Sequence, residues 1–303
     1  MITRHTQRNV TWIDCISPTP TEVRQLMYEF GIEPAFAEEL LLPSFKSRVE
    51  RRSDLLLAIL HFPVLRTSRQ HPEQEIDFVI GKNFLITIRY EQIDPLHSFA
   101  KAFAVEAVLG TDATTAHGGH LFVAMVRNIY QALGDECDTI RRRLRDIEEH
   151  VFSGEERTMV AHLSQTGRVI HDFRQSLVPH DEMLASIEAA GIRLFGQEFG
   201  YHMKILVGAY QRVERTLENL YDSLAELRET NNSLLSTKQN ETMKNLTIMA
   251  FVTFPLTLIS SIFGMNTHYT PLIGAPYDFW IIIGGMIVIA GSLFLFFKHK
   301  HWL

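Results

Sequence analysis

The sequence predicts an N-terminal α/β domain, a long-helix stalk and a two-helix transmembrane hairpin. Short strand-like runs alternate with two short helical segments in residues 1–95, as is typical of an α/β domain. The pattern is then helical, with no helix breaker from about residue 199 until Pro255. Residues 246–263 and 279–297 carry no formal charge, and each run is long enough to cross a bilayer core as a helix.

The domain organisation follows from these shifts in pattern. The two apolar runs occupy the last fifth of the 303 residues, which leaves a large soluble part. The first residues form no apolar run, so we expect no signal peptide. The expected segments are a cytoplasmic α/β domain (1–95), a cytoplasmic helical hairpin region (96–198), a long stalk helix continuing into transmembrane helix 1 (199–263), an external loop (264–278), transmembrane helix 2 (279–297) and a basic cytoplasmic tail (298–303).

The first 95 residues predict a largely antiparallel sheet with two short helices. The first helix should open at Ser17 to Pro20 and end before Gly31, and the second should run from Pro34 through Leu42. Gly81-Lys82-Asn83 is typical of a tight hairpin between two strands. The expected strands are 10–16, 48–52, 55–62, 75–80 and 84–90.

Three long helical segments follow. Residues 120–151 carry apolar side chains at spacings of three and four, which predicts an amphipathic helix. A second helix should return over about 157–190, interrupted near Pro179. A third should run over 199–263, and its length without a local partner indicates self-association.

Flanking charges orient the two apolar runs. Lys238 and Lys244 precede the first run, and Lys298 and Lys300 follow the second. The link over 264–278 has no Lys or Arg. The positive-inside rule therefore places both chain ends in the cytoplasm of an inner-membrane, multi-pass protein, with the link outside. The alternative is a pair of buried helices in a large soluble core.

Composition excludes several function classes. A formal net charge of −6 argues against nucleic acid as a partner. The sequence has no Walker-type glycine loop, no HExxH and no serine elbow, so we do not expect an enzyme. The two cysteines have no metal-ligand spacing. The histidine pairs His117/His120 and His299/His301 are expected on the surface rather than as metal ligands.

One face of the first apolar run and its approach is distinctive. Its members recur at steps of three and four, close to a 3.5-residue repeat, and we call them the seam: Asn240, Met243, Leu246, Ala250, Phe254, Thr257, Ser261 and Gly264. Two helices of one chain cannot enclose a water path, but a ring of several copies can if the seam faces the ring axis. The alternative is a helix–helix contact face rich in small residues.

These residues resemble a known family. Gly264-Met265-Asn266 ends the first apolar run, and a short link, a second run and a basic tail follow. Before it stand Asn-Glu-Thr-Met-Lys-Asn-Leu-Thr over 240–247 and Pro255-Leu256-Thr257. The arrangement resembles the CorA magnesium-channel family over essentially the whole chain.

The resemblance implies a homopentameric funnel embedded in membrane lipids, with one long pore helix from each subunit. Gly264, Met265 and Asn266 would form the selectivity filter at the outer mouth, where the Asn266 amide oxygens contact a hydrated divalent ion. By the same matching, Met243, Leu246 and Phe254 would be hydrophobic constrictions, and Asn240 and Thr257 would be polar rings. Glu229 would hold a regulatory metal ion, with Glu91 or Asp94 of a neighbouring subunit as candidate partners.

The transported ion implied by the resemblance is Mg²⁺, with Co²⁺ and Ni²⁺ as further candidates. Many magnesium members carry an acidic residue soon after the tripeptide, whereas residues 267–276 have none, so a zinc transporter of the same fold, moving Zn²⁺, is an alternative. Phe254 is bulkier than the methionine often found at this place in the family, which predicts a tighter gate. The rival from another class is a non-conducting, membrane-anchored sensor or scaffold.

Overall fold

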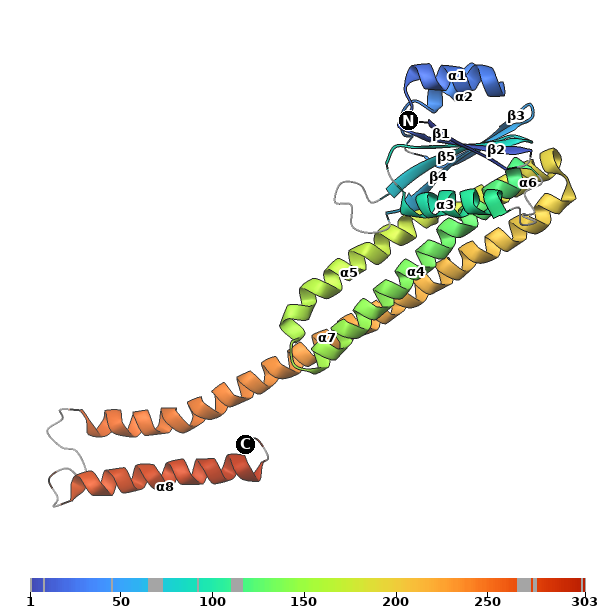
Figure 1. Ribbon diagram of the computed structural model, residues 1–303. Helices are drawn as coiled ribbons and strands as arrows, with labels where there is room; N and C mark the ends of the chain where they lie inside the picture. The colour runs from blue at the N-terminus through green and yellow to red at the C-terminus, as the bar shows by residue number, and fades with distance from the viewer. Residues whose placement is uncertain are drawn as a thin grey trace. The chain divides into compact units, whose positions relative to one another are not determined.

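A computed structural model of the chain describes residues 2–7, 9–44, 46–64, 73–91, 93–109, 117–265, 274, 277–300 and 302 (Figure 1). The chain divides into two compact units, Met1–Arg228 (unit 1) and Glu229–Leu303 (unit 2). The long helix α7 (Gln197–Phe263) contributes residues to both units.

Unit 1 is built on one six-stranded sheet with the order β1-β2-β6-β5-β4-β3. Only the β2–β6 pair is parallel among these strands, so the prediction of a largely antiparallel sheet is confirmed. Gly81 donates its N–H to the Phe84 carbonyl at 3.0 Å in the predicted hairpin. The strands are β1 (Ile2–Gln7), β2 (Val10–Ile16), β3 (Arg48–Arg52), β4 (Leu55–Pro63), β5 (Glu73–Ile80) and β6 (Phe84–Arg89).

The edge strand β1 is absent from the sequence-based prediction. Five of its six residues are polar, so it lacks the apolar signal of a half-buried strand. It forms because β2 offers a full antiparallel partner, from Ile2 opposite Cys15 to Gln7 opposite Val10. Tertiary pairing therefore overrides weak local preference here.

Two short helices cover one face of the sheet, as Figure 1 shows. Helix α1 (Pro20–Phe30) begins with a capping box between Thr19 and Glu22, within the stretch from Ser17 to Pro20 where the sequence predicts its start. It ends at Gly31, whose φ of 68° suits glycine, as expected. Helix α2 (Pro34–Glu39) stops three residues before the predicted end at Leu42.

The other sheet face packs against helices, in contacts that join β2, β5 and β6 to α4 and β4 to α5 and α6. Phe78 of β5 meets Phe122 of α4 edge to face, with ring centroids 5.1 Å apart. Trp12 donates its indole N–H to Thr87 at 2.9 Å, and Thr87 donates to Asp14. The buried Trp12, Thr87 and Asp14 side chains on this face are thus joined by hydrogen bonds.

The long helices agree with the predicted pattern. They are α3 (Asp94–Leu109), α4 (Gly118–Phe152), α5 (Glu156–Leu177) and α6 (His180–Phe195), and the α5–α6 break falls at Pro179. The α4 stripe from Ile129 to Val151 is buried as predicted. In α7, Val213, Leu217, Leu220 and Leu224 are buried inside unit 1. The expectation that this part of the helix lacks a local partner is therefore wrong.

Unit 2 contains the rest of α7 and helix α8 (Asp278–His299). Both α7 and α8 are long and apolar enough to cross a membrane. Their most apolar windows are only 6% and 0% buried within the chain. The alternative of two helices buried in a soluble core of this chain is therefore wrong.

Candidate functional site

The predicted seam lies along the part of α7 that belongs to unit 2. Seven of its eight members are exposed and Ala250 is half-buried; the exposed members are Asn240, Met243, Leu246, Phe254, Thr257, Ser261 and Gly264. Phe254 is 72% exposed, and it follows the exposed Met243 and Leu246 along the same face; such a row of exposed apolar side chains is unusual on a soluble protein. No other part of the described chain therefore covers these side chains, and they are accessible to lipid, water or another subunit.

The opposite face of α7 is more covered. Its members are buried or half-buried, and apart from the adjacent Pro255 and Leu256 they recur at steps of three and four: Ile248, Val252, Pro255, Leu256, Ile259 and Phe263. At 100° per residue, this face lies on the other side of the helix from the seam. One side of α7 is thus covered within the chain, and the seam is the side left open.

Hydroxyl side chains on this part of α7 bond to their own helix. Thr257 donates to the Thr253 carbonyl at 2.9 Å, and Thr253 donates to the Met249 carbonyl at 2.8 Å. A hydroxyl whose hydrogen is used in this way still has acceptor capacity on its oxygen. The Thr257 hydroxyl oxygen on the exposed seam can therefore accept a hydrogen bond from a water molecule.

The end of α7 carries the first two residues of the predicted filter. Gly264 donates its N–H to the Ser260 carbonyl at 3.0 Å, and Met265 donates to Ile262 at 3.4 Å. A Cβ on residue 264 would stand 3.0 Å from the Ser260 oxygen, so this turn suits glycine. Asn266 and most of the expected external loop lie outside the described residues.

Glu229, the predicted regulatory ligand, is exposed on α7 as the first residue of unit 2. Its candidate partners Glu91 and Asp94 are exposed on unit 1. Exposed carboxylates remain accessible to a cation or to a neighbouring subunit.

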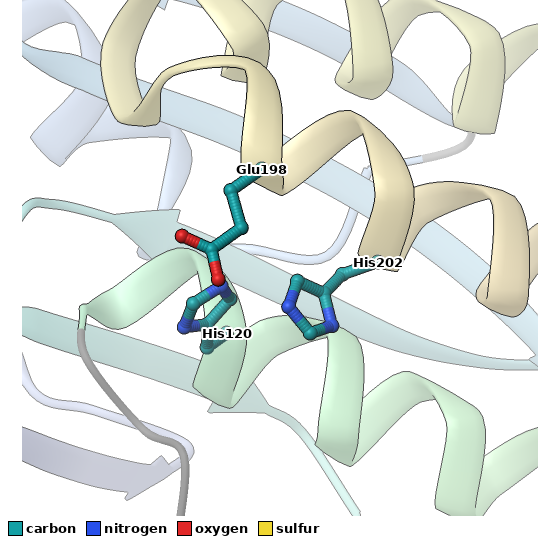
Figure 2. A group of neighbouring side chains, drawn as sticks. All are labelled: His120, Glu198 and His202. Atoms are coloured by element: carbon teal, nitrogen blue, oxygen red, sulfur yellow. The ribbon is translucent and has the colours of Figure 1, made fainter.

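Sequence reasoning missed a second group of polar side chains, in unit 1. His120, expected on the surface, is only 8% exposed and lies beside Glu198 and His202 (Figure 2). The signals were present in the sequence as the His117/His120 pair and as a Glu and a His four residues apart. His120 is about eighty residues away from Glu198 and His202 in the sequence, so only the fold brings these side chains together.

An α/β unit, followed by two apolar helical segments that are exposed within the chain and long enough to cross a membrane, defines an integral membrane protein with a large soluble part. Residues 7–299 match the family model described as CorA-like Mg²⁺ transporter protein. The chain belongs to this family.

Relatives in sequence and solved structures of similar fold agree with this family assignment. The cobalt/magnesium transport protein CorA of Thermotoga maritima is 24% identical over 299 residues, which cover 97% of this chain and 83% of the relative. The complete structure of the CorA magnesium transporter from Methanocaldococcus jannaschii matches with a TM-score of 0.84 and 21% identity, over 97% of this chain and 92% of that one. The ZntB cytoplasmic domain from Vibrio parahaemolyticus matches with a TM-score of 0.62 and 14% identity, over 78% of this chain and 91% of that one.

Proposed function

We propose that the protein is a homopentameric channel for divalent cations, with Mg²⁺ as the main ion and Co²⁺ and Ni²⁺ as further ions. The observation that carries the proposal is the exposed seam on α7, opposite the face of that helix that the chain covers. A five-fold ring with the seam on its axis gives these side chains an aqueous surrounding. The names of relatives such as the T. maritima cobalt/magnesium transport protein support the choice of ions.

The proposed path selects the ion with its water attached. Mg²⁺ releases water reluctantly, so neutral oxygens that accept hydrogen bonds from its first-shell waters recognise it without stripping it. Asn266 supplies such oxygens at the outer mouth, beside Gly264 and Met265, and Thr257 and Asn240 supply them further along. Rings of Met243, Leu246 and Phe254 close the path by excluding water.

The membrane potential drives influx. Moving one charge through 100 mV releases about 2.3 kcal/mol, so a divalent ion gains about twice that without ATP. Glu229 serves as the regulatory site, because an internal divalent ion bound there and to a neighbouring subunit holds the subunits together and the gate shut. Both chain ends face the cytoplasm in this proposal.

The test is ion flux into liposomes that contain the purified full-length protein. Mg²⁺ influx should follow the membrane potential and be blocked by cobalt hexammine, which mimics hydrated Mg²⁺. Asn266→Ala should abolish influx while the oligomer persists in size-exclusion chromatography. Asn245→Ala is the matched control, because Asn245 is exposed on α7 but off the seam. Normal influx through Asn266→Ala would contradict the filter, and a monomer in lipid would contradict the channel.

A zinc transporter of the same fold is the second candidate. The absence of acidic residues from 267 to 276 favours it, because it weakens capture of cations at the mouth. The fold likeness to the ZntB cytoplasmic domain is compatible with it. Zn²⁺ flux that follows a proton gradient would select this candidate, and no flux of any divalent ion would select the non-conducting sensor or scaffold.

A further inference from the structure

Three side chains of types that commonly bind metal ions lie close together in unit 1, whereas the seam lies in unit 2. His120 lies in the first turn of α4, and Glu198 and His202 lie four residues apart near the start of α7. One ligand atom from each lies within 4.8 Å of the others, and Figure 2 shows the carboxylate and both imidazoles converging. We call this group the His–Glu–His cluster.

Glycines fix the backbone that carries His120. A Cβ on residue 118 would stand 2.2 Å from the Phe84 carbonyl oxygen, and Gly118 donates its N–H to the Lys82 carbonyl at 2.8 Å. A Cβ on Gly119 would come within 2.9 Å of the Phe195 and Phe199 rings. The start of α4 is therefore held against the β5–β6 turn on one side and these rings on the other.

The start of α7 is fixed in the same way. Phe199 is completely buried and fills the space beside Gly191, where a Cβ would stand 2.1 Å from its ring. Phe199 follows Glu198 directly and precedes His202 by less than one turn. Its buried ring thus sets the rotation of the helix that presents these two ligands.

A third imidazole orients His120 without joining the cluster. His117 accepts the His120 backbone N–H on Nδ1 at 3.3 Å, and its ring stacks on His120 and Phe195 with centroids 3.9 and 4.5 Å apart. His117 therefore fixes the turn that carries His120 through these contacts.

We propose that His120, Glu198 and His202 form a binding site for one borderline divalent metal ion of the class of Zn²⁺, Co²⁺ and Ni²⁺. Imidazole nitrogens suit these ions, whereas Mg²⁺ and Ca²⁺ prefer oxygen ligands. Two histidines and one carboxylate are a known zinc ligand set that leaves one position open for water. The site is distinct from the proposed transport path and does not rest on it, because all three ligands belong to unit 1.

An ion can reach the His–Glu–His cluster from solvent, and the cluster can close around it. Exposure increases across the cluster, from buried His120 through half-buried His202 to exposed Glu198, so an ion can enter from solvent. Bonds of about 2.0–2.1 Å in a tetrahedral site place ligand atoms roughly 3.3 Å apart. The exposed Glu198 side chain can rotate to shorten the present separations, so binding would tie the start of α7 to the start of α4.

The experiment titrates the metal-free, full-length protein in detergent with Zn²⁺ and with Co²⁺, with excess Mg²⁺ present throughout to occupy oxygen-ligand sites. Wild type should bind one such ion per chain that excess Mg²⁺ does not displace, with the strong visible absorption of Co²⁺ in a low-coordinate site. His202→Ala and Glu198→Gln should each weaken this binding by about 100-fold or more, since even loss of an outer-shell partner costs 10–100-fold.

His171→Ala, which removes an exposed histidine on α5, is the matched control and should bind like wild type. Zn²⁺ should also raise the Tm of wild type and of this control, but not of His202→Ala. The Tm of each variant without metal, if equal to that of wild type, excludes unfolding as the cause. Unchanged affinity and unchanged Co²⁺ absorption in both His202→Ala and Glu198→Gln would overturn the proposal.

Discussion

Large apolar side chains are mostly buried in unit 1 and mostly exposed or half-buried in unit 2. In unit 1, Trp12, Phe78 and Phe122 are completely buried, whereas in unit 2 Phe254 and Trp280 are about 70% exposed (72% and 68%). A core buried within one chain is stabilised without any partner. The described apolar surface of unit 2 instead requires lipid, other copies of the chain, or both.

Helix α7 shows both patterns, with buried apolar side chains in its first part and exposed ones in its second part. Leu217, Leu220 and Leu224 are buried within unit 1, while Leu246 and Leu258 are exposed in unit 2. The first part alternates its leucines with charged residues that face water, and residues 246–263 have no charge at all. The same helix geometry therefore serves a packed soluble fold and a membrane span, and composition separates the two.

The largest effect is expected from removing a core aromatic of unit 1. Phe78→Ala should lower the free energy of unfolding by about 3–5 kcal/mol, because its ring is fully buried against Phe122 and leaves a cavity. Denaturant titration of the full-length protein in lipid nanodiscs measures it. Phe152→Ala, at an exposed phenylalanine on α4, is the control and should change little. Equal losses for both variants would contradict a closed core.

The second effect is a pH dependence confined to unit 1. His180 is fully buried; its Nδ1 lies 2.7 Å from the Tyr130 hydroxyl, and its Nε2 lies 2.8 Å from the His61 carbonyl, to which it donates. Burial lowers the pKa of His180 from 6.5 to about 4. Between these values the unfolded chain binds more protons, so stability is full above pH 6.5 and falls toward pH 4, by about 3 kcal/mol.

Unfolding curves from pH 7 to pH 4.5 test this sign. His180→Gln keeps one donor and one acceptor but does not titrate, so its stability should fall less steeply with decreasing pH. His171→Gln, at an exposed position on α5, should follow wild type. Parallel curves for His180→Gln and wild type would remove His180 as the cause.

The third effect concerns regulation at the first residue of unit 2. Glu229→Ala should raise the internal Mg²⁺ concentration that half-inhibits uptake by about two- to fivefold, since an exposed carboxylate contributes on the order of 0.5–1 kcal/mol. Uptake into liposomes preloaded with Mg²⁺ measures the inhibition curve. Glu226→Ala, at an exposed acid three residues earlier, is the control. If Glu229→Ala has the wild-type curve, this residue is not a sensor.

The smallest effect is expected on an exposed face of α8. Leu295→Ala should change stability by less than about 1 kcal/mol, because lipid tails are as apolar as leucine and moving the side chain between them gains little. The same nanodisc titration applies, with Leu224→Ala in unit 1 as the contrasting variant at about 2–5 kcal/mol. A loss for Leu295→Ala as large as that for Leu224→Ala would show that this face is packed in the assembly.

Local patterns were sufficient where one short stretch carries the whole signal. The hairpin at Gly81, the stop at Gly31 and the two uncharged runs could be predicted because turn chemistry and span length are properties of neighbouring residues. The seam could be predicted for the same reason, because helix periodicity alone determines which side chains share a face. Its role as a pore lining stays a prediction.

The sequence by itself determined that residues 246–263 and 279–297 form long apolar helices, because charge and length decide that without reference to any other segment. Only the tertiary structure decided that the polar strand β1 completes the sheet and that His120 is buried beside Glu198 and His202. These outcomes depend on contacts between residues far apart in the chain. No local preference specifies which distant segment will supply the partner.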